Sequence, residues 1–132
     1  MMRAVLADTG PLYAAVDPED TYHHRALQEL EKLDNDQRQV VILYSTLLEA
    51  YSLIMFRLGR DVASNWLTEM AAAALVNPAP EDYRQAAEKI RMLADQSITL
   101  FDAVAAVVAT RLRVDVWTYD HHFDVMRVPV WR

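Results

Sequence analysis

Four carboxylates stand in surroundings that set them apart from the other acidic residues of the sequence. Asp8 and Asp120 each follow directly on a short apolar run, as residues at the end of a buried strand do. Glu49 and Asp102 are the only charged residues of two otherwise apolar stretches, residues 46–56 and 96–110. A lone carboxylate on a buried helix is unfavourable unless it is paired or bound to a metal ion. These four residues are therefore candidate metal ligands.

Each of the four also has an ordinary structural interpretation. Asp8 suits the N-cap of a helix, and Asp120 suits a turn. Glu49 would suit a salt bridge to an arginine elsewhere in the chain. Asp102 stands three residues after Thr99, which is the spacing of a capping box. For Asp8 and Asp120 taken alone, the structural interpretation is favoured.

The combination favours metal binding. Four carboxylates converging on one crevice would repel one another, and some would take up protons. A hard divalent cation removes this conflict, and an all-oxygen ligand set favours Mg²⁺ or Mn²⁺ over zinc. Such an ion retains bound water, which can serve as the nucleophile in hydrolysis of a phosphodiester bond.

The elements that must position these carboxylates alternate between strands and helices. Short apolar runs predict strands at residues 3–7, 40–44, 75–77, 114–119 and 126–131, the last at a sheet edge because it contains Pro129. Helical periodicity predicts helices from residue 23 and over 46–58, 61–74, 81–94 and 99–111, and Pro11 suits the first turn of another. We expect the nearly all-apolar helices 46–58 and 99–111 to be buried.

This alternation predicts an α/β fold in three layers, with a mostly parallel sheet of about five strands. In such folds the functional site lies beyond the carboxyl ends of the strands, where Asp8 and Asp120 stand.

Composition narrows the class of protein. The 132 residues, 53% of them apolar, suit a single domain over residues 1–132. The sequence has no cysteine, which excludes disulfides and cysteine-based zinc sites. Asp8 comes too early for a signal peptide and no apolar stretch has the length of a membrane span, so we expect a cytoplasmic protein. The net charge of −6 argues against a nucleic-acid partner, although arginine, the better phosphate ligand, dominates the basic residues.

Five short motifs, in order along nearly the whole chain, resemble those of the PIN-domain family, and in particular the small VapC-type toxins. They are Val-Leu-Ala-Asp8-Thr9-Gly-Pro-Leu, Asp20-Thr-Tyr-His23-His-Arg-Ala26, Ser45-Thr-Leu-Leu-Glu49-Ala-Tyr, Leu100-Phe-Asp102-Ala-Val-Ala-Ala and Thr118-Tyr-Asp120-His-His-Phe123. The resemblance implies a five-stranded parallel sheet between helices and Mg²⁺- or Mn²⁺-dependent cleavage of single-stranded RNA. It further implies a homodimer and inhibition by a small antitoxin, and it casts Asp8, Glu49, Asp102 and Asp120 as the catalytic and metal-binding residues.

Further residues have a possible role around this site. Thr9 and Thr118 could support it through their hydroxyls, although local bonds to the backbone are the favoured interpretation. RNA phosphates could be bound by arginines that follow the two acid-bearing helices, although favourable placement at helix C-termini is preferred. These arginines are Arg57, Arg60, Arg111 and Arg113.

The remaining candidates have mainly structural interpretations. His121 and His122 flank Asp120, and an exposed histidine pair in a turn needs no metal to explain it. Asp124 is interpreted as a surface residue in preference to a substitute ligand. His23 is expected at the edge of the core, and Trp66 and Met70 in the core or in a subunit contact.

Three rival functions were weighed. The string Asp8-Thr9-Gly10 occurs in aspartic proteases, but their glycine-rich β folds do not suit a chain with two glycines. A structure-specific DNA nuclease would use a similar metal cluster, but the chain is too short for the additional helices that grip duplex DNA. A PIN-like module could also bind RNA or protein without cutting, and such a module would lack a tight divalent-cation site.

Overall fold

The fold is built on a parallel sheet whose strands all end on the same side. Residues 3–132 are described by a computed structural model of the chain. The strands are β1 (Ala4–Ala7), β2 (Gln39–Leu43), β3 (Ala74–Val76) and β4 (Asp115–Trp117). They are arranged in the order β3-β2-β1-β4, and every neighbouring pair is parallel. The first and last strands in sequence are therefore direct neighbours in the sheet.

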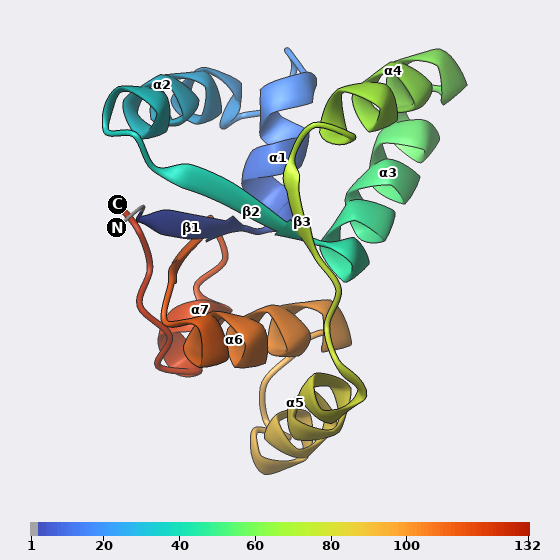
Figure 1. Cartoon of the computed structure of the whole chain (residues 1–132). Coiled ribbons are helices and arrows are strands. Elements are labelled where there is room, and N and C mark those ends of the chain that lie inside the picture. Colours follow the sequence, from blue (N-terminus) through green and yellow to red (C-terminus); the bar gives the residue numbers. More distant parts are fainter. Residues whose placement is uncertain (1–2) are drawn as a thin grey trace.

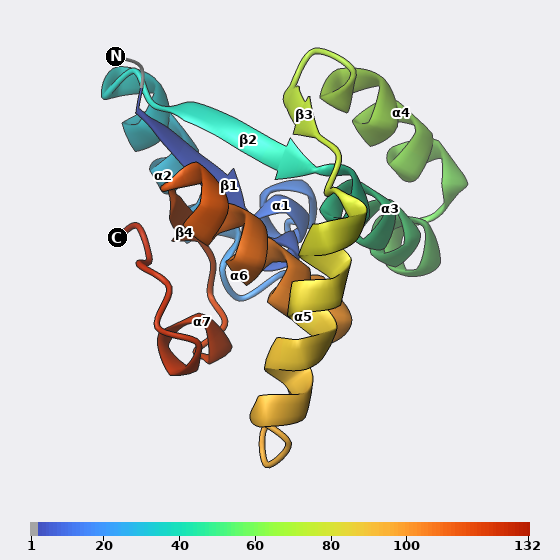
Figure 2. The same ribbon diagram turned by 60° about the horizontal axis from the view of Figure 1, so that its bottom comes forward.

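Helices cover both faces of this sheet, as Figure 1 shows. On one face lie α1 (Thr9–Val16), α2 (His23–Asn35), α3 (Tyr44–Leu58) and α4 (Arg60–Met70). On the other lie α5 (Pro80–Met92), α6 (Leu100–Leu112) and the short α7 (His122–Val125). Figure 2 shows α6 lying between the sheet and α5. This arrangement confirms the predicted three-layer α/β fold.

The alternation of side chains along each strand divides the core between the two faces. Val5 and Ala7 of β1 pack among residues of α1, α3 and α4, whereas Leu6 packs against α6 on the opposite face. In β4, Trp117 packs on the same face as Val5 and Ala7, and Val116 packs on the α6 face with Leu6. A strand buried on both faces has to be apolar throughout, which is why the sequence shows short continuous apolar runs here.

Two helices that are apolar nearly all round behave differently. In α6, residues 102–109 are all buried, as predicted. In α3 the prediction of full burial is wrong, because Leu48 is 65% exposed and Phe56 is 87% exposed. The inner face of α3 packs on the sheet, while its outer face is apolar and open.

The last predicted strand is reduced to a single contact. Residues 122–125 form α7, and only Val130 bridges in parallel to Val116, on the free side of β4. Pro129 accepts a hydrogen bond from the Val116 backbone but has no N–H to continue a ladder. Arg127 has a φ of 60°, which further interrupts an extended path. The sheet therefore has four strands, with this edge contact where a fifth was expected.

Helices α5 and α6 are joined by an ion pair. The Arg111 guanidinium donates to both oxygens of the Asp82 carboxylate, at 3.0 and 2.8 Å. The same carboxylate accepts a bond from the Ala79 backbone N–H, which caps the start of α5. Asp82 is buried, so these bonds replace the water that its charge would otherwise need.

Within residues 3–132 there is no helix with the length and apolar character that crossing a membrane requires.

Candidate metal centre

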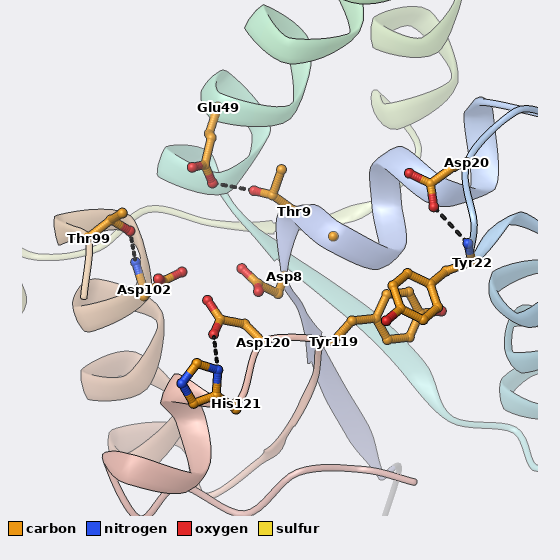
Figure 3. A pocket seen from close by; sticks show the side chains of 11 residues that line it. Asp8, Thr9, Asp20, Tyr22, Glu49, Thr99, Asp102, Tyr119, Asp120 and His121 are labelled. Carbon is orange, nitrogen blue, oxygen red and sulfur yellow. Dashed lines mark hydrogen bonds and ion pairs between the residues drawn. The ribbon is translucent and has the colours of Figure 1, made fainter. Parts of the chain in front are cut away.

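The four predicted carboxylates meet at the carboxyl edge of the sheet. Asp8 follows β1 directly and Asp120 follows β4, and these two strands are neighbours. Glu49 reaches the same place from the first half of α3, and Asp102 from the first turn of α6. All four line one pocket of about 490 Å³. Figure 3 shows the side chains of Asp8, Asp102 and Asp120 gathered at its centre.

We call this cavity the acidic pocket. Its lining residues are Asp8, Thr9, Gly10, Asp20, Tyr22, Glu49, Thr99, Asp102, Tyr119, Asp120 and His121. Five of these are not among the site residues that the sequence predicts: Gly10, Asp20, Tyr22, Thr99 and Tyr119. Tyr119 was adjacent to a predicted site residue, and Thr99 was expected only as a cap. Asp20 and Tyr22 precede α2, far from any predicted acid in sequence, so spacing alone gave no signal for them.

Thr118 ties two of the acids together. Its hydroxyl donates to Oδ2 of Asp8 at 2.8 Å and accepts from the backbone N–H of Asp120 at 2.9 Å. The local backbone bond that the sequence favoured is therefore present. The hydroxyl also contacts the Asp8 carboxylate, because the adjacent strands β1 and β4 bring the two residues together.

Thr9 has the corresponding position beside Glu49. The Thr9 hydroxyl donates to Oε1 of the Glu49 carboxylate, which fixes the orientation of that side chain (Figure 3). A bond to a carboxylate replaces the local backbone bond that was the favoured expectation for Thr9. No arginine forms a salt bridge with Glu49 among the residues that the structure describes, so the salt-bridge interpretation is not realised.

The ordinary interpretations of the other acids are met only in part. Asp8 stands at the N-cap of α1, but its side chain makes no capping hydrogen bond. In α6 it is the backbone N–H of Asp102 that donates to the Thr99 hydroxyl, at 3.2 Å, so the carboxylate of Asp102 is available to the pocket. Asp120 accepts from the His122 backbone N–H at 2.9 Å, which is the expected turn. Local structure and a place in the pocket are thus compatible.

Burial and mutual repulsion raise the proton affinity of the cluster. Burial, reinforced by the charges of Glu49 and Asp120, raises the pKa of Asp8 to about 6, against the lowering effect of the Thr118 bond. Burial, with the charges of Asp8 and Asp120, likewise raises the pKa of Asp102 to about 6. Glu49 has a raised pKa because it is partly buried and lies near Asp102. The pKa of each of these three carboxyl groups therefore responds to the charge of at least one other acid.

The donor set fits a hard divalent cation. Carboxylate oxygens converge, and no lysine or arginine lines the pocket among residues 3–132. The charge of a lysine or arginine is therefore lacking where three acids have raised pKa values. An ion such as Mg²⁺ or Mn²⁺ would supply that charge and would find the oxygen ligands that it prefers.

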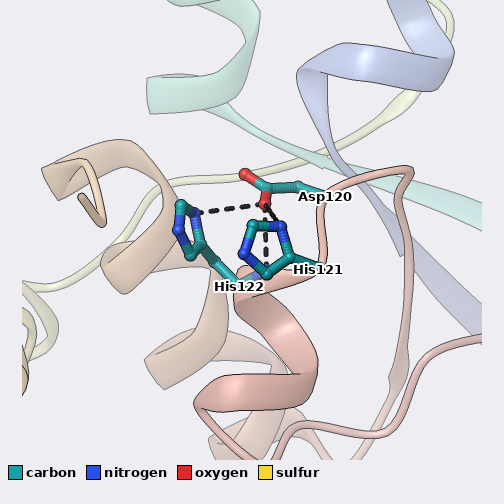
Figure 4. Close-up of side chains that lie close together, drawn as sticks. All are labelled: Asp120, His121 and His122. Atoms are coloured by element: carbon teal, nitrogen blue, oxygen red, sulfur yellow. Dashed lines mark hydrogen bonds and ion pairs between the residues drawn. The ribbon is translucent and has the colours of Figure 1, made fainter. Parts of the chain in front are cut away.

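Two histidines extend the donor set on one side, as Figure 4 shows. Nδ1 of His122 lies 3.1 Å from Oδ1 of Asp120, and Nδ1 of His121 lies 3.7 Å from the same oxygen. The three side chains offer donor atoms within 4.8 Å of one another. Nδ1 of His122 is buried without a hydrogen-bond partner among the described residues, since its contact with Asp120 is close in distance but not aligned as a hydrogen bond. The pair is thus less like a solvated turn than the sequence indicated.

The four arginines named as possible RNA contacts do not line the acidic pocket. Arg111 is bound to Asp82, and the Arg57 guanidinium lies 5.2 Å from the centre of the Tyr13 ring. Neither these two nor Arg60 and Arg113 line the pocket. Their contact with RNA stays a prediction.

Three further side chains match their structural interpretation. Asp124 is exposed and pairs with Arg132 at 3.2 Å, as befits a surface residue. Nδ1 of His23 lies 2.7 Å from the Ala14 carbonyl oxygen at the edge of the core. Trp66 is buried among core residues.

Comparison with known proteins supplies an independent observation. A family profile described as PIN domain matches residues 5–129. VapC20 of Mycobacterium tuberculosis, described as a sarcin-ricin loop cleaving toxin, has a similar structure, with a TM-score of 0.85 and 17% identity over 97% of this chain and 98% of that chain. VapBC2 of Rickettsia felis, solved on a DNA fragment from its promoter, matches with a TM-score of 0.71 and 12% identity over 98% and 97%. FitAcB of Neisseria gonorrhoeae matches with a TM-score of 0.69 and 17% identity over 97% and 96%. No curated protein sequence matches the chain.

Proposed function

The chain belongs to the PIN-domain family, and on this basis we propose that it is a metal-dependent endoribonuclease that cleaves single-stranded RNA. The observation that carries the proposal is the acidic pocket, in which four carboxylates converge and which no lysine or arginine from residues 3–132 lines. An arrangement of this kind binds cations, and the reaction that best uses a cation beside an anionic substrate is hydrolysis of a phosphodiester bond.

Each carboxylate of the acidic pocket has a proposed role in this reaction. Asp8, Asp102 and Asp120 are the proposed direct ligands, because they are gathered at the centre of the pocket (Figure 3). When bound, Mg²⁺ or Mn²⁺ offsets the charge of the phosphate and makes a coordinated water more acidic. Glu49, oriented by Thr9, accepts the proton of the attacking water or binds a second ion. Water adds to phosphorus as the bond to the 3′ oxygen breaks, which leaves a 5′-phosphate and a 3′-hydroxyl.

Thr118 acts on this reaction indirectly, as a positioning residue. Its hydroxyl stabilises the ionised form of the buried Asp8 carboxylate, which is the form that binds metal. Hydrogen bonding to the charged form of an acid lowers its pKa, and here it opposes the effect of burial.

RNA is the proposed substrate, and an antitoxin is the proposed partner. Support for both comes from structural neighbours, one described as a toxin that cleaves the sarcin-ricin loop and another as VapBC2.

An apolar groove of about 370 Å³ runs between α1, α2 and α4 and would accept an apolar segment of the antitoxin. Leu27 and Leu30 are 44% and 36% exposed in this groove, and Trp66 and Met70 line it as well. We therefore assign the chain to the toxin side of a toxin–antitoxin pair.

The outer face of α3 supports a homodimer. Leu48, Met55 and Phe56 are 65%, 44% and 87% exposed, on a helix with few charged residues. Large apolar side chains exposed on one helix are characteristic of protein interfaces. A second copy of the chain is the proposed occupant.

A cleavage assay tests the enzymatic proposal. Purified protein is incubated with single-stranded RNA in Mn²⁺, in EDTA, and in EDTA followed by excess Mn²⁺. We expect cleavage with Mn²⁺, loss in EDTA, and recovery when Mn²⁺ is restored. The Asp102→Asn variant should be inactive yet as stable as the parent chain without metal, because it removes a charge from a repulsive cluster. Asp61→Asn, in the first turn of α4, is the matched control and should cleave normally.

The outcomes separate the proposal from its alternative. Cleavage that persists in EDTA or in Asp102→Asn contradicts the assigned metal site. A chain that binds RNA but shows no tight divalent-cation site by calorimetry would instead be a binding module without nuclease activity.

A further inference from the structure

An aromatic pair, one ring exposed and the other half-buried, lies at the acidic pocket. Tyr22 and Tyr119 both line the pocket, and their ring centroids are 4.7 Å apart with an angle of 35° between the rings (Figure 3). Tyr22 is 43% exposed, although it is a large aromatic residue. An exposed aromatic ring beside a site for phosphate chemistry is a surface on which a nucleobase can stack.

Tyr119 is held rigidly in this position. Its hydroxyl donates to Oε1 of Glu29 at 2.5 Å, and the Nε1–H of the fully buried Trp117 donates to the same oxygen at 3.2 Å. The ring of Tyr119 therefore forms a fixed support for the more exposed ring of Tyr22. A support that is ordered before the ligand arrives loses little conformational freedom on binding.

A cation stands next to the pair. The Arg25 guanidinium carbon lies 4.5 Å from the centre of the Tyr119 ring and 5.7 Å from that of Tyr22. Its side chain is 50% exposed, and its Nε lies 3.6 Å from Oε2 of Glu29, which is longer than a hydrogen bond. Unlike Arg111, Arg25 makes no bidentate bond to a carboxylate within residues 3–132. Arg25 is therefore available to an anionic ligand.

The surface is continuous from the carboxylates to this arginine. A second, polar pocket of about 270 Å³ shares Tyr119, Asp120 and His121 with the acidic pocket and adds Arg25 and Arg132. A strand whose scissile phosphate lies at Asp120 can thus pass over Tyr119 and reach Arg25. No lysine or arginine from residues 3–132 lines the acidic pocket, so a neighbouring phosphate gains most from the position beside Arg25.

We infer that Tyr22, supported by Tyr119, stacks on an unpaired nucleobase next to the scissile phosphate, and that Arg25 binds the adjacent phosphate. This assignment rests on the proposed nuclease function and adds a reason for its preference for single strands. A paired base is stacked between its own neighbours and cannot present its face to Tyr22, whereas an unpaired base can. We call Tyr22 and Tyr119 the aromatic platform. It distinguishes substrates by whether a base is unpaired more than by which base it is.

Steady-state cleavage by the full chain tests the aromatic pair. With a single-stranded RNA of mixed sequence and Mn²⁺, Tyr22→Ala should raise KM by at least about fivefold, in line with the usual contribution of one stacked base. The Tyr22→Phe variant should stay within about twofold of the parent chain, because it keeps the ring. Tyr22→Leu, which keeps apolar bulk without the ring, should resemble Tyr22→Ala. Tyr83→Ala, a comparably exposed tyrosine on α5, is the control and should change nothing.

An abasic substrate isolates the stacking contact. Removal of the base next to the cleavage site should raise KM for the parent chain by a similar factor. It should leave the KM of Tyr22→Ala unaffected, because both changes remove the same contact.

For Arg25→Gln, the slope of log KM against log salt should fall by about 0.7, the value for one phosphate of a single strand. Arg84→Gln on α5 is the matched control and should leave this slope unchanged.

A measurement without turnover completes the test. Quenching of 2-aminopurine placed at the same nucleotide should be seen with the Asp102→Asn chain and lost when Tyr22→Ala is added. If the parent chain cleaves RNA but KM and quenching are insensitive to Tyr22→Ala, or if Tyr22→Leu matches the parent, the platform is refuted and the nuclease proposal stands. If the parent chain neither binds nor cleaves single-stranded RNA, both are refuted.

Discussion

The hydroxyl of Thr118 donates a 2.8 Å hydrogen bond to Oδ2 of Asp8, across 110 positions of the sequence. Thr118 itself is buried, so this bond is shielded from water. Because the bond favours the ionised carboxylate, it counteracts the burial that raises the pKa of Asp8. Thr118 therefore supports a carboxylate that we propose as a metal ligand.

Replacement of Thr118 by valine, which has nearly the same shape, should weaken Mn²⁺ binding by about tenfold, the lower end of the range for loss of a group that supports a metal ligand. The measurement is isothermal titration calorimetry at neutral pH. Thr110→Val is the control, because the Thr110 hydroxyl bonds only to the Ala106 carbonyl on the same helix. Equal Mn²⁺ affinity in Thr118→Val and the parent chain would remove Thr118 from the site.

Stability of the metal-free chain should depend on pH through Asp8 and Asp102. Their pKa values are raised from the ordinary 3.8 to about 6 in the folded state, so the folded state holds more protons than the unfolded state in this interval. The two groups therefore lower the free energy of unfolding as the pH rises from about 4 to about 6, and the full penalty remains above that range.

A divalent cation should cancel this penalty. We expect Mg²⁺ or Mn²⁺ to raise Tm by several degrees at pH 7.5 and by much less at pH 5, where protons compete for the same oxygens. Thermal unfolding at both pH values, with and without Mn²⁺, measures the difference. A Tm increase that is equal at the two pH values would speak against binding to these carboxylates.

The ion pair between Asp82 and Arg111 should contribute to stability and not to metal binding. We expect Asp82→Ala to lower the free energy of unfolding by about 2 kcal/mol, because it leaves the Ala79 N–H and the Arg111 guanidinium without their partner. The ion pair lowers the pKa of Asp82, so its contribution is present near neutral pH and is lost as the pH falls below the ordinary range. Urea unfolding at pH 7 and pH 3 tests both statements, and unchanged stability at pH 7 would contradict them.

The outer face of α3 should govern association. Phe56→Ser changes a residue that is 87% exposed, so the fold should be unaffected while the proposed dimer dissociates. Analytical ultracentrifugation over a range of concentrations gives the measurement. Met92→Ser is the control, since Met92 is 77% exposed on α5, a different helix. If Phe56→Ser and the parent chain sediment alike, the second copy does not bind this face.

Much of the site was predictable because its acids stand where local patterns are informative. Asp8 and Asp120 end apolar runs, and parallel strands place their carboxyl ends at one edge. The solitary charges at Glu49 and Asp102 stand out within apolar helices. Their convergence follows from the strand order β3-β2-β1-β4, which the sequence does not state directly.

The parts that were missed depend on tertiary contacts. The open face of α3 could not be foreseen, because a helix that is apolar nearly all round does not reveal which side meets the sheet. The last strand was expected from its apolar residues, whereas α7 and Pro129 leave only the contact at Val130. Tyr22 reaches the pocket from a turn before α2, and its partner Tyr119 is 97 positions away by residue number. No local periodicity connects such residues.

The pairing of β1 with β4 has a consequence for synthesis of the protein. Asp8 is synthesised 110 positions before Thr118, its hydrogen-bond partner. Strand β4, which pairs with β1, and Asp120 are also synthesised late. Before Asp120 is added, the nascent polypeptide lacks one of the proposed metal ligands. The proposed ligand set, and any cleavage that depends on it, would therefore be complete only after translation has passed β4.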